Sequence, residues 1–526
     1  MAGVVQVGRA GDQAVDGILS GVKWADHRLT VSFPERPDFY GTPYGSGEPA
    51  TNFRAFDAAQ KAAARASLAS YAAVANLAFT EITETAARHA DLRFALSDRP
   101  GTAWAYFPSD AAEAGDSWYN GSSGWYDDVS RGGYGFHSLQ HEIGHALGLK
   151  HGHESGGLGK LPADRDSMEY TIMTYHSYVG SSATATYTNQ VWSYPQSLMP
   201  YDIAALQHMY GANYGANRGN TVYSWSPTTG ELFVNGVGQG APGGNHIFMT
   251  VWDGGGTDSY DLSAYAGGVR IDLQPGGWVV AAEAQLARLS LDGAHVAAGN
   301  VANALLHDDD PRALIENAVG GSGDDVIVGN VGGNLLLGGA GRDFLDGGAG
   351  IDNLRGDSGN DTLFGSEGND RLVGGAGSDR LEGGPGADEL RGESGGDALL
   401  GGPAGDKLYG GFGADRLTGG AGADRFFLTA IGETGVTAAT CDIITDFEVG
   451  IDVINLAKIN AVQGGGNTAF AFIGTEAFTA AGQLRFELDA GRSRTLVEGN
   501  VDQDLAPDFR IELFGLYGLS GADFVL

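Results

Sequence analysis

Three histidines and one glutamate have the residue types and the spacing of a metal site. His141 and His145 are four residues apart, so on a helix their imidazoles lie on one face, separated by about one turn of 5.4 Å. Glu142 lies beside them and is placed to hold a metal-bound water. Gly148 can adopt a backbone conformation that other residues avoid, which lets the helix stop and His151 return as a third ligand. Three protein ligands leave one position open for water, as catalytic zinc requires.

The short pattern of two histidines and a glutamate also arises by chance on ordinary surface helices. Gly148 and His151 at the required offsets make that alternative rare, so the segment predicts a zinc site. Four other histidines lack this spacing and are expected to be solvated or structural: His89, His137, His153 and His176.

A second pattern repeats every nine residues between Gly320 and Leu428 and approximates Gly-Gly-x-Gly-x-Asp-x-Leu-x. The glycines predict a tight turn whose backbone carbonyls face a cation, and the aspartate adds a carboxylate. The x-Leu-x piece predicts a short strand whose leucine enters the core. The acidic position of the repeat falls at Asp325, Asn334, Asp343, Asp352, Asp361, Asp370, Asp379, Asp388, Asp397, Asp406, Asp415 and Asp424.

Two repeats make one coil, so aspartates 18 residues apart are expected to stack along two edges. Stacked carboxylates repel one another unless cations lie between them, so this region is predicted to unfold without calcium and to fold with it. The alternative is a flexible glycine-rich linker, but a linker has no reason to keep an apolar residue at a period of nine. Asn334 replaces an aspartate and Ala404 a glycine, which makes calcium sites near those turns doubtful.

The composition agrees with cation binding. The chain has 526 residues, enough for two or three domains, and a formal net charge of -34, which argues against nucleic acid or an anionic membrane surface as a partner. Acidity that only keeps a secreted protein soluble is the alternative. Cys441 is the only cysteine, which excludes an intramolecular disulfide framework and a CxxC metal site. We see no secretory signal peptide and expect no transmembrane helix.

The rest of the chain before residue 217 is typical of a mixed α/β domain. We expect a long helix capped by Asn52 and continuing to Val74, and a second helix that begins near Phe136 and carries the histidines. Strands are expected near residues 79–82, 92–96 and 103–107. Glycine, serine and aspartate dominate residues 115–135, which predicts a loop. Short strands are expected at 217–316 and again at 429–526.

These residues resemble the metzincin metallopeptidases, and in particular the serralysins. Met173 in Tyr170–Tyr175 matches the metzincin Met-turn, which would form a hydrophobic floor under the metal. The segments 104–108, 115–120 and 201–208 and the glycine repeats extend the resemblance over roughly residues 15–526. Serralysins usually have proline directly after the third histidine, whereas this chain has Gly152.

The resemblance implies a mechanism. Zinc lowers the pKa of its water to about 7 and polarises the scissile carbonyl, while Glu142 takes the proton of the water and passes it to the leaving amine. Tyr175 would ligate zinc in the resting enzyme and swing away to stabilise the oxyanion, although a buried structural tyrosine is the alternative. The strand at residues 103–107 would be the edge along which an extended substrate pairs. An edge strand with no such role is equally compatible with the sequence.

The resemblance also implies calcium ligands outside the repeats, for which ordinary turn residues are the alternative. The zinc ligands expected are His141, His145, His151 and Tyr175. The calcium ligands expected are Asp253, Gly255, Asp258, Glu316, Asp325, Asp343, Asp352, Asp361, Asp370, Asp379, Asp388, Asp397, Asp406 and Asp415.

The predicted fold class is α+β: a metzincin-like zinc protease domain, a calcium-bound parallel β-roll and a C-terminal β-sandwich-like region. The expected division is a possible short propeptide at 1–18, the peptidase domain at 19–216, the β-roll at 217–428 and a C-terminal β region at 429–526. By resemblance, this last region carries a type I secretion signal, with Asp523 and the apolar residues after it at its end.

The expected function is that of a secreted zinc endopeptidase that acts as a monomer on extracellular proteins. The alternative is a calcium-dependent surface or adhesion protein whose protease-like domain has lost its activity. The intact His141, Glu142, His145, His151 and Tyr175 favour the first.

Overall fold

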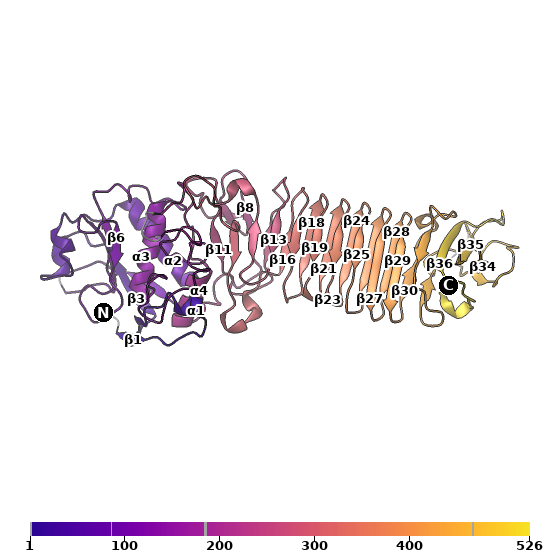
Figure 1. The fold of residues 1–526 in the computed structure, drawn as a ribbon, viewed down its shortest axis with the longest axis horizontal. Helices are drawn as coiled ribbons and strands as arrows, with labels where there is room; N and C mark the ends of the chain where they lie inside the picture. The colour runs from indigo at the N-terminus through magenta and orange to yellow at the C-terminus, as the bar shows by residue number, and fades with distance from the viewer. Residues whose placement is uncertain (1–2, 86, 183–186, 465–467) are drawn as a thin grey trace. The chain divides into compact units, whose positions relative to one another are not determined.

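The computed structural model describes residues 3–85, 87–182, 187–464 and 468–526. Its contacts divide the chain into two units. The first comprises Met1–Ser259 and Pro275–Ile315, and the second comprises Tyr260–Gln274 and Glu316–Leu526. Every α-helix formed by the described residues belongs to the first unit, whereas the second is built mainly from ranks of parallel strands (Figure 1).

A five-stranded sheet in the first unit has the strand order β4-β3-β5-β7-β6. Its strands are β3 (Arg28–Ser32), β4 (Ala78–Glu81), β5 (Leu92–Ser97), β6 (Ala103–Ala105) and β7 (Ser117–Asn120). The first four in this order pair in parallel, and β6 pairs antiparallel to β7 at the edge. Every side chain of β5 is buried, as expected for the central strand.

The strands predicted near residues 79–82, 92–96 and 103–107 are confirmed as β4, β5 and β6. The loop predicted for residues 115–135 is wrong in part, because β7 lies within it. Trp118 and Tyr119 of β7 are fully buried, and their burial outweighs the glycine- and serine-rich composition around them.

Three helices pack against this sheet region and its neighbours: α2 (Ala58–Val74), α3 (Tyr134–Leu147) and α4 (Pro200–Tyr210). The prediction that Asn52 caps α2 is wrong. Asp57 caps it, because its carboxylate accepts the backbone N–H of Gln60 while the Gln60 side chain accepts the N–H of Asp57. Asn52 lies in a turn at a positive φ of 52°.

The chain start is packed into the first unit. The short helix α1 (Gln13–Asp16) is followed by Ile18 and Leu19, which are fully buried. Lys150 Nζ donates a hydrogen bond of 2.6 Å to the carbonyl of Gly17. The other strands that lie wholly in this unit are β1 (Val4–Gln6), β2 (Val22–Trp24), β8 (Val222–Trp225), β9 (Leu232–Val234), β10 (Val237–Gly238), β11 (Met249–Val251), β14 (Trp278–Val280) and β15 (Val301–Asn303).

The second unit contains a roll of two parallel sheets. One contains, in order, β16 (Asn317–Val319), β18 (Leu335–Ala340), β21 (Asn353–Ser358), β24 (Arg371–Ala376), β26 (Glu389–Ser394), β28 (Lys407–Phe412), β30 (Arg425–Phe427), β32 (Val453–Asn455) and β37 (Phe524–Val525). The other contains β13 (Arg270–Asp272), β17 (Val326–Val328), β19 (Phe344–Asp346), β22 (Thr362–Phe364), β25 (Arg380–Glu382), β27 (Ala398–Pro403), β29 (Arg416–Ala421) and β31 (Asp442–Ile444).

The strand register confirms that two repeats make one coil. Leu336 pairs with Leu354 and Leu354 with Leu372 in one sheet, and Leu345 pairs with Leu363 in the other, each 18 residues on. The leucines of successive coils are buried with almost no exposed surface, so they form a continuous core between the sheets. The architecture is therefore mostly parallel β-sheet with few helices, as a β-roll requires.

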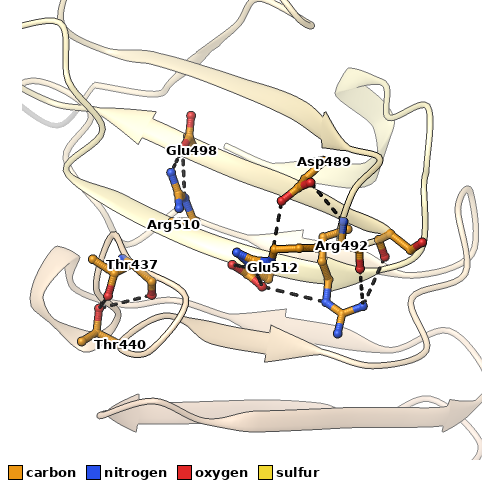
Figure 2. A network of polar contacts seen from close by, with 9 residues as sticks. Thr437, Thr440, Asp489, Arg492, Glu498, Arg510 and Glu512 are labelled. Carbon is orange, nitrogen blue, oxygen red and sulfur yellow. Dashed lines mark hydrogen bonds and ion pairs between the residues drawn. The ribbon is translucent and has the colours of Figure 1, made fainter.

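An antiparallel meander of β34 (Gln483–Asp489), β35 (Arg494–Asn500) and β36 (Phe509–Phe514) follows, with the short β33 (Ala471–Phe472) beside it. Its buried acids are paired with arginines (Figure 2). Arg510 donates two hydrogen bonds of 3.0 and 2.6 Å to Glu498, and Arg492 contacts Glu512. Such pairing is required because an unpaired buried carboxylate is strongly destabilising.

The last strand of the chain pairs with the roll. Asp523 is buried and accepts the backbone N–H of Gly450 at 2.9 Å, and β37 pairs in parallel with β32. Among the described residues, none of the helices combines the length and the apolar character needed to cross a membrane.

Candidate metal centre and active site

Helix α3 supplies three of the residues predicted to form the metal site. His141, Glu142 and His145 lie on it and are buried. The helix ends at Gly148, which has a φ of 111°. A side chain here would also collide with the chain, because a Cβ would lie 2.2 Å from the carbonyl oxygen of Val22. Glycine is therefore required at this position on two grounds, and the chain turns from it towards His151.

Neighbouring side chains hold the end of α3 in place. Trp24 Nε1 donates to the carbonyl of Ala146 at 2.8 Å, and the Tyr210 hydroxyl donates to the carbonyl of Leu147 at 2.7 Å. These are carbonyls that no helical N–H can satisfy. Met173 is fully buried beside the helix, where a Cβ on Gly144 would lie 2.6 Å from its Sδ atom. The glycine within the histidine motif is therefore needed for Met173 to pack this closely.

Three imidazole nitrogens converge at this point. The Nε2 atom of His151 lies 3.0 Å from Nε2 of His141 and 3.0 Å from Nε2 of His145. Two nitrogens bound at 2.0–2.1 Å to one tetrahedral zinc ion lie roughly 3.3 Å apart. The structure thus brings the three predicted histidines together in an arrangement that could hold such an ion.

The protonation states also suit a metal. His141 Nδ1 lies 2.7 Å from the carbonyl oxygen of Ile172, and His145 Nδ1 lies 2.8 Å from that of Leu149. A carbonyl only accepts hydrogen bonds, so these Nδ1 atoms carry the protons and the Nε2 atoms keep their lone pairs. Burial lowers the pKa of His141 to about 4 and that of His151 to about 2, so the imidazoles are neutral.

Glu142 is buried beside the histidines. Its Oε2 atom has no hydrogen-bond partner among the described residues. Burial raises its pKa to about 8, opposed in part by a backbone hydrogen bond from Ala105 of the edge strand β6. A dication at the imidazoles would also lower this pKa, because it stabilises the carboxylate. A carboxyl group with a pKa near neutrality can both take and give a proton.

Tyr175 lies at the open side of the histidine cluster. Its ring centroid is 4.3 Å from that of His151 and 6.2 Å from that of His141. The side chain is about one third exposed, and burial raises its pKa to about 12. The tyrosine therefore keeps its proton near neutral pH and is placed to donate a hydrogen bond towards the cluster.

Asp202 is a positioning residue that the sequence did not single out. It is fully buried in the first turn of α4 and accepts the backbone N–H groups of Ile172 and Met199 at 2.8 and 2.9 Å. Its other oxygen accepts the Thr171 hydroxyl at 2.5 Å. Because the carbonyl of Ile172 orients His141, Asp202 fixes both the turn at Met173 and one of the histidines. Asp202 had no predicted role beyond its place in the serralysin-like segment 201–208, because an acid in the first turn of a helix is usually exposed.

The repeat aspartates form two hydrogen-bonded ladders. Asp343 N donates to Oδ1 of Asp361 at 2.8 Å, and Asp361 N donates to Oδ1 of Asp379 at 2.8 Å. The second edge repeats this arrangement from Asp352 to Asp370 at 2.9 Å. Each rung therefore uses one carboxylate oxygen to bind the backbone of the preceding coil.

The second oxygen of each aspartate is left without a partner. In ten of them, Oδ2 is buried and has no hydrogen-bond partner among the described residues: Asp343, Asp352, Asp361, Asp370, Asp379, Asp388, Asp397, Asp406, Asp415 and Asp424. Buried polar atoms are rarely left unsatisfied, and a row of carboxylate oxygens suits a hard cation such as calcium.

The first position of each ladder differs. Both oxygens of Asp325 accept backbone N–H groups, from Val269 at 2.7 Å and Gly321 at 2.6 Å. The side-chain oxygen of Asn334 accepts the backbone N–H of Asn330. Its amide nitrogen donates a hydrogen bond of 2.7 Å to the carbonyl of Glu316. The chain itself supplies the partners at these positions. Ala404 adopts a positive φ of 93°, whereas Gly395 and Gly413, at the same position of the neighbouring repeats, have φ values of 146° and 144°.

The expected calcium ligands before the repeats are partly brought together. Asp253 and Asp258 are both buried, and burial raises the pKa of Asp253. Asp253 also accepts the N–H of Gly255 at 2.8 Å and the hydroxyl of Tyr223 at 2.7 Å. That these residues bind calcium stays a prediction.

Asp442 and Asp452 extend the ladders beyond the regular repeats. Asp415 N donates to Asp442 Oδ1 at 3.1 Å, and Asp424 N donates to Asp452 Oδ1 at 2.9 Å. The sequence analysis missed both, because 27 and 28 residues separate these partners in place of 18. A signal was present, since each is followed two residues later by an isoleucine, as in the repeat.

Comparison with known proteins gives one consistent family. The family model for the C-terminal part of the serralysins, peptidase family M10, matches residues 212–526. Serralysin C of Dickeya chrysanthemi is 37% identical over 291 residues, which cover 53% of this chain and 55% of the relative. Metalloprotease AprA of Pseudomonas entomophila is 31% identical over 337 residues, which cover 60% and 63%. The chain thus spans about half the length of the curated relatives that it matches.

Without a bound cation, the folded roll should lose stability as the pH rises from about 4 to 7. Burial, with repulsion from like charges, raises the pKa of Asp343 and Asp352 to about 7, above the value near 3.9 of an unfolded chain. Between these values the folded roll binds protons that the unfolded chain does not, so its stability is complete only below the lower value. In excess chelator, circular dichroism should therefore show a larger folded fraction of the roll at pH 5 than at pH 8, where we expect it to be unfolded.

The control for this pH dependence is Glu476→Gln, since Glu476 is exposed and lies outside the ladders. The double variant Asp343→Asn and Asp352→Asn should reduce the difference in folded fraction between pH 5 and pH 8, whereas the control should keep this difference. Equal folded fractions at pH 5 and pH 8 in the parent protein would contradict this account.

Proposed function

The chain belongs to the serralysin family of M10 peptidases, and from this membership and the geometry of the histidine centre we propose that it is a secreted zinc-dependent endopeptidase. The observation that carries the proposal is the convergence of three Nε2 atoms, two of them on buried histidines, beside the unpartnered Oε2 of Glu142. Three nitrogen ligands with an open side are typical of a catalytic zinc site, whereas a structural site has four protein ligands.

In this proposal His141, His145 and His151 hold the zinc. When bound, zinc supplies Lewis-acid polarisation of the substrate carbonyl and lowers the pKa of a water molecule to about 7. Glu142 orients that water, accepts its proton through the free Oε2 and delivers the proton to the leaving amine. Burial supports this role, because a carboxylate that solvent does not stabilise is a stronger base.

The edge strand β6 fits an extended peptide substrate. It forms the edge of its sheet, and Ala105 at its end hydrogen-bonds to Glu142 through its backbone. Backbone pairing along such an edge gives affinity with little demand on the substrate sequence. We therefore propose that the enzyme hydrolyses proteins with broad specificity.

Tyr175 is proposed as the oxyanion donor. Its ring lies against His151, and its hydroxyl keeps its proton near neutral pH. A donor aimed at the tetrahedral oxygen stabilises the charge that develops in the transition state. In the resting protein the same hydroxyl is proposed as a further ligand of the zinc.

The second unit is proposed to bind several calcium ions along the aspartate ladders. The support is the row of ten buried Oδ2 atoms without a partner. Low calcium in the cytosol would leave the roll unfolded for type I secretion, and external calcium would fold it. The division into a propeptide at 1–18, a peptidase domain, a roll and a C-terminal signal region, and the monomeric state, remain part of the proposal.

Glu142→Gln should abolish peptide hydrolysis while zinc remains bound. The amide keeps the volume of the side chain but cannot accept the proton of water, which should lower kcat by roughly 10²–10⁴-fold. Casein hydrolysis and zinc content by mass spectrometry are measured on the same sample.

Glu35→Gln, at an exposed position, is the control and should keep both. Hydrolysis at the parent rate in Glu142→Gln would refute the mechanism. The adhesion alternative requires a parent protein that hydrolyses no protein even when loaded with zinc.

Tyr175→Phe should lower kcat by about 10²–10³-fold with little change in KM, because it removes a donor that acts in the transition state. The neighbouring Tyr178, stacked on His295, provides a matched control as Tyr178→Phe. An unchanged kcat in Tyr175→Phe, or an equal loss in the control, would remove Tyr175 from the mechanism.

Calcium should fold the roll in a titration that starts from chelator-treated protein. All eight tryptophans lie in the first unit, so their fluorescence shows whether that unit stays folded. A change in circular dichroism without a change in fluorescence then follows the folding of the roll. Asp379→Asn, in the middle of a ladder, should move the calcium midpoint to higher concentration, because the amide is neutral and a weaker ligand than a carboxylate. Glu476→Gln, at an exposed position outside the ladders, is the control. A midpoint that is the same in both variants and the parent would argue against calcium at the ladder.

A further inference from the structure

A second group of potential metal ligands lies next to the histidine centre. Within the described ranges, His151, His153 and Glu154 each offer one ligand atom within 4.8 Å of the other two. The spacing in the sequence gave His153 no role. The group lies in the segment after the third histidine, where this chain has Gly152 in place of the usual proline.

His151 faces both groups. Its Nε2 atom lies among the other two histidines, whereas its Nδ1 atom lies 3.0 Å from Oε1 of Glu154. The ring of His153 is nearly parallel to that of His151, with centroids 5.4 Å apart. The Nδ1 atom of His153 is buried and has no hydrogen-bond partner in the described part of the chain. A buried ring nitrogen without a partner is uncommon and indicates a missing ligand or proton donor.

The backbone that carries this group is firmly held. Gly152 N donates to the carbonyl of Met173 at 2.8 Å, and Lys150 Nζ donates to the carbonyl of Glu154 at 2.8 Å. A side chain at Gly152 would meet Leu161, whose Cδ1 lies 2.2 Å from the position of a Cβ. The side chains of His153 and Glu154 therefore project from a fixed turn, and little ordering is needed for them to bind an ion.

We propose that His153 and Glu154, at the Nδ1 side of His151, form a second and weaker zinc site, and that zinc bound there inhibits peptide hydrolysis. The inhibitory part rests on the proposed function. Imidazole and carboxylate together suit zinc, whereas calcium prefers a larger set of oxygen ligands. The site is weaker than the first because it has fewer protein ligands and because the side chain of Glu154 is about half exposed.

Inhibition follows from the contacts of Glu154 and His153. Glu154 accepts the Nδ1–H of His151, a contact that orients an imidazole and strengthens it as a ligand. An ion that takes the carboxylate of Glu154 removes this support. The ring of His153 lies 5.0 Å from that of Tyr175, so an ion held by His153 also restricts the space in which Tyr175 can move.

The test counts zinc ions and measures activity separately. The full chain is loaded with zinc, kept in excess calcium so that the aspartate ladders are occupied, and titrated with Zn²⁺ by calorimetry and equilibrium dialysis. The parent protein should bind one further zinc ion. His153→Ala and Glu154→Gln should lose that ion and keep the first. The control is His89→Ala, since His89 and Glu84 form another histidine–carboxylate pair, 2.8 Å apart, and it should bind as the parent does.

Activity is measured over the same zinc range, with each variant normalised to its own rate without added zinc. Half-inhibition should need at least about tenfold more zinc in His153→Ala than in the parent or the His89→Ala control. The second zinc ion persisting with unchanged affinity in both His153→Ala and Glu154→Gln would overturn the site. A second ion that binds at these residues but leaves the rate unchanged would overturn the inhibitory role. If the parent hydrolyses no peptide, the proposed function fails, and the count of bound zinc still decides whether the site exists.

Discussion

Lone pairs that face one another in a buried space must be separated by a cation or a proton, and both units of this protein are built around that constraint. In the first unit the Nε2 atoms of His141, His145 and His151 approach to 3.0 Å with their other nitrogens already engaged. In the second, the Oδ2 atoms of successive aspartates are buried in rows without donors. Neither arrangement is stable without positive charge, because a buried polar atom without a partner costs roughly 1–3 kcal/mol. We therefore expect folding and cation binding to be coupled.

The scaffold that creates the first site depends on close backbone approaches. Gly148 lets the chain leave α3 against the carbonyl of Val22, and Gly144 lets Met173 pack against the same helix. Asp202 then fixes the turn before Met173 through two backbone N–H groups. These contacts set the carbonyl that orients His141. The geometry of the imidazoles is thus determined by residues that never touch the metal, in agreement with the general behaviour of supporting contacts around metal ligands.

The sequence predicted the parts of the protein that are governed by short-range spacing. The histidine motif places its side chains through one helix turn and one glycine, and the repeat sets the register of 18 residues because each coil contacts only the next. Features that depend on distant partners were missed. The burial of Trp118 makes β7 a strand within a glycine-rich segment. Asp442 continues a ladder although an insertion breaks the period. In both cases the deciding contact lies outside the local pattern. The cap of α2 is different, because Asp57 and Gln60 are three residues apart and their capping box was present in the sequence.

The two units differ in the types of ligand atom that they offer to a cation. All twelve histidines lie in the first unit, and the second unit offers carboxylate and carbonyl oxygens together with one buried cysteine, Cys441. Zinc favours imidazole nitrogen, and calcium favours many oxygens, so the ligand chemistry of the first unit suits zinc and that of the second suits calcium. The turn at His153 and Glu154 is an exception to this separation, since it sets a nitrogen and an exposed carboxylate beside a site that already holds three imidazoles. A histidine and a carboxylate together favour zinc over calcium even when calcium is abundant. Abundant calcium is the condition under which a calcium-folded enzyme would work.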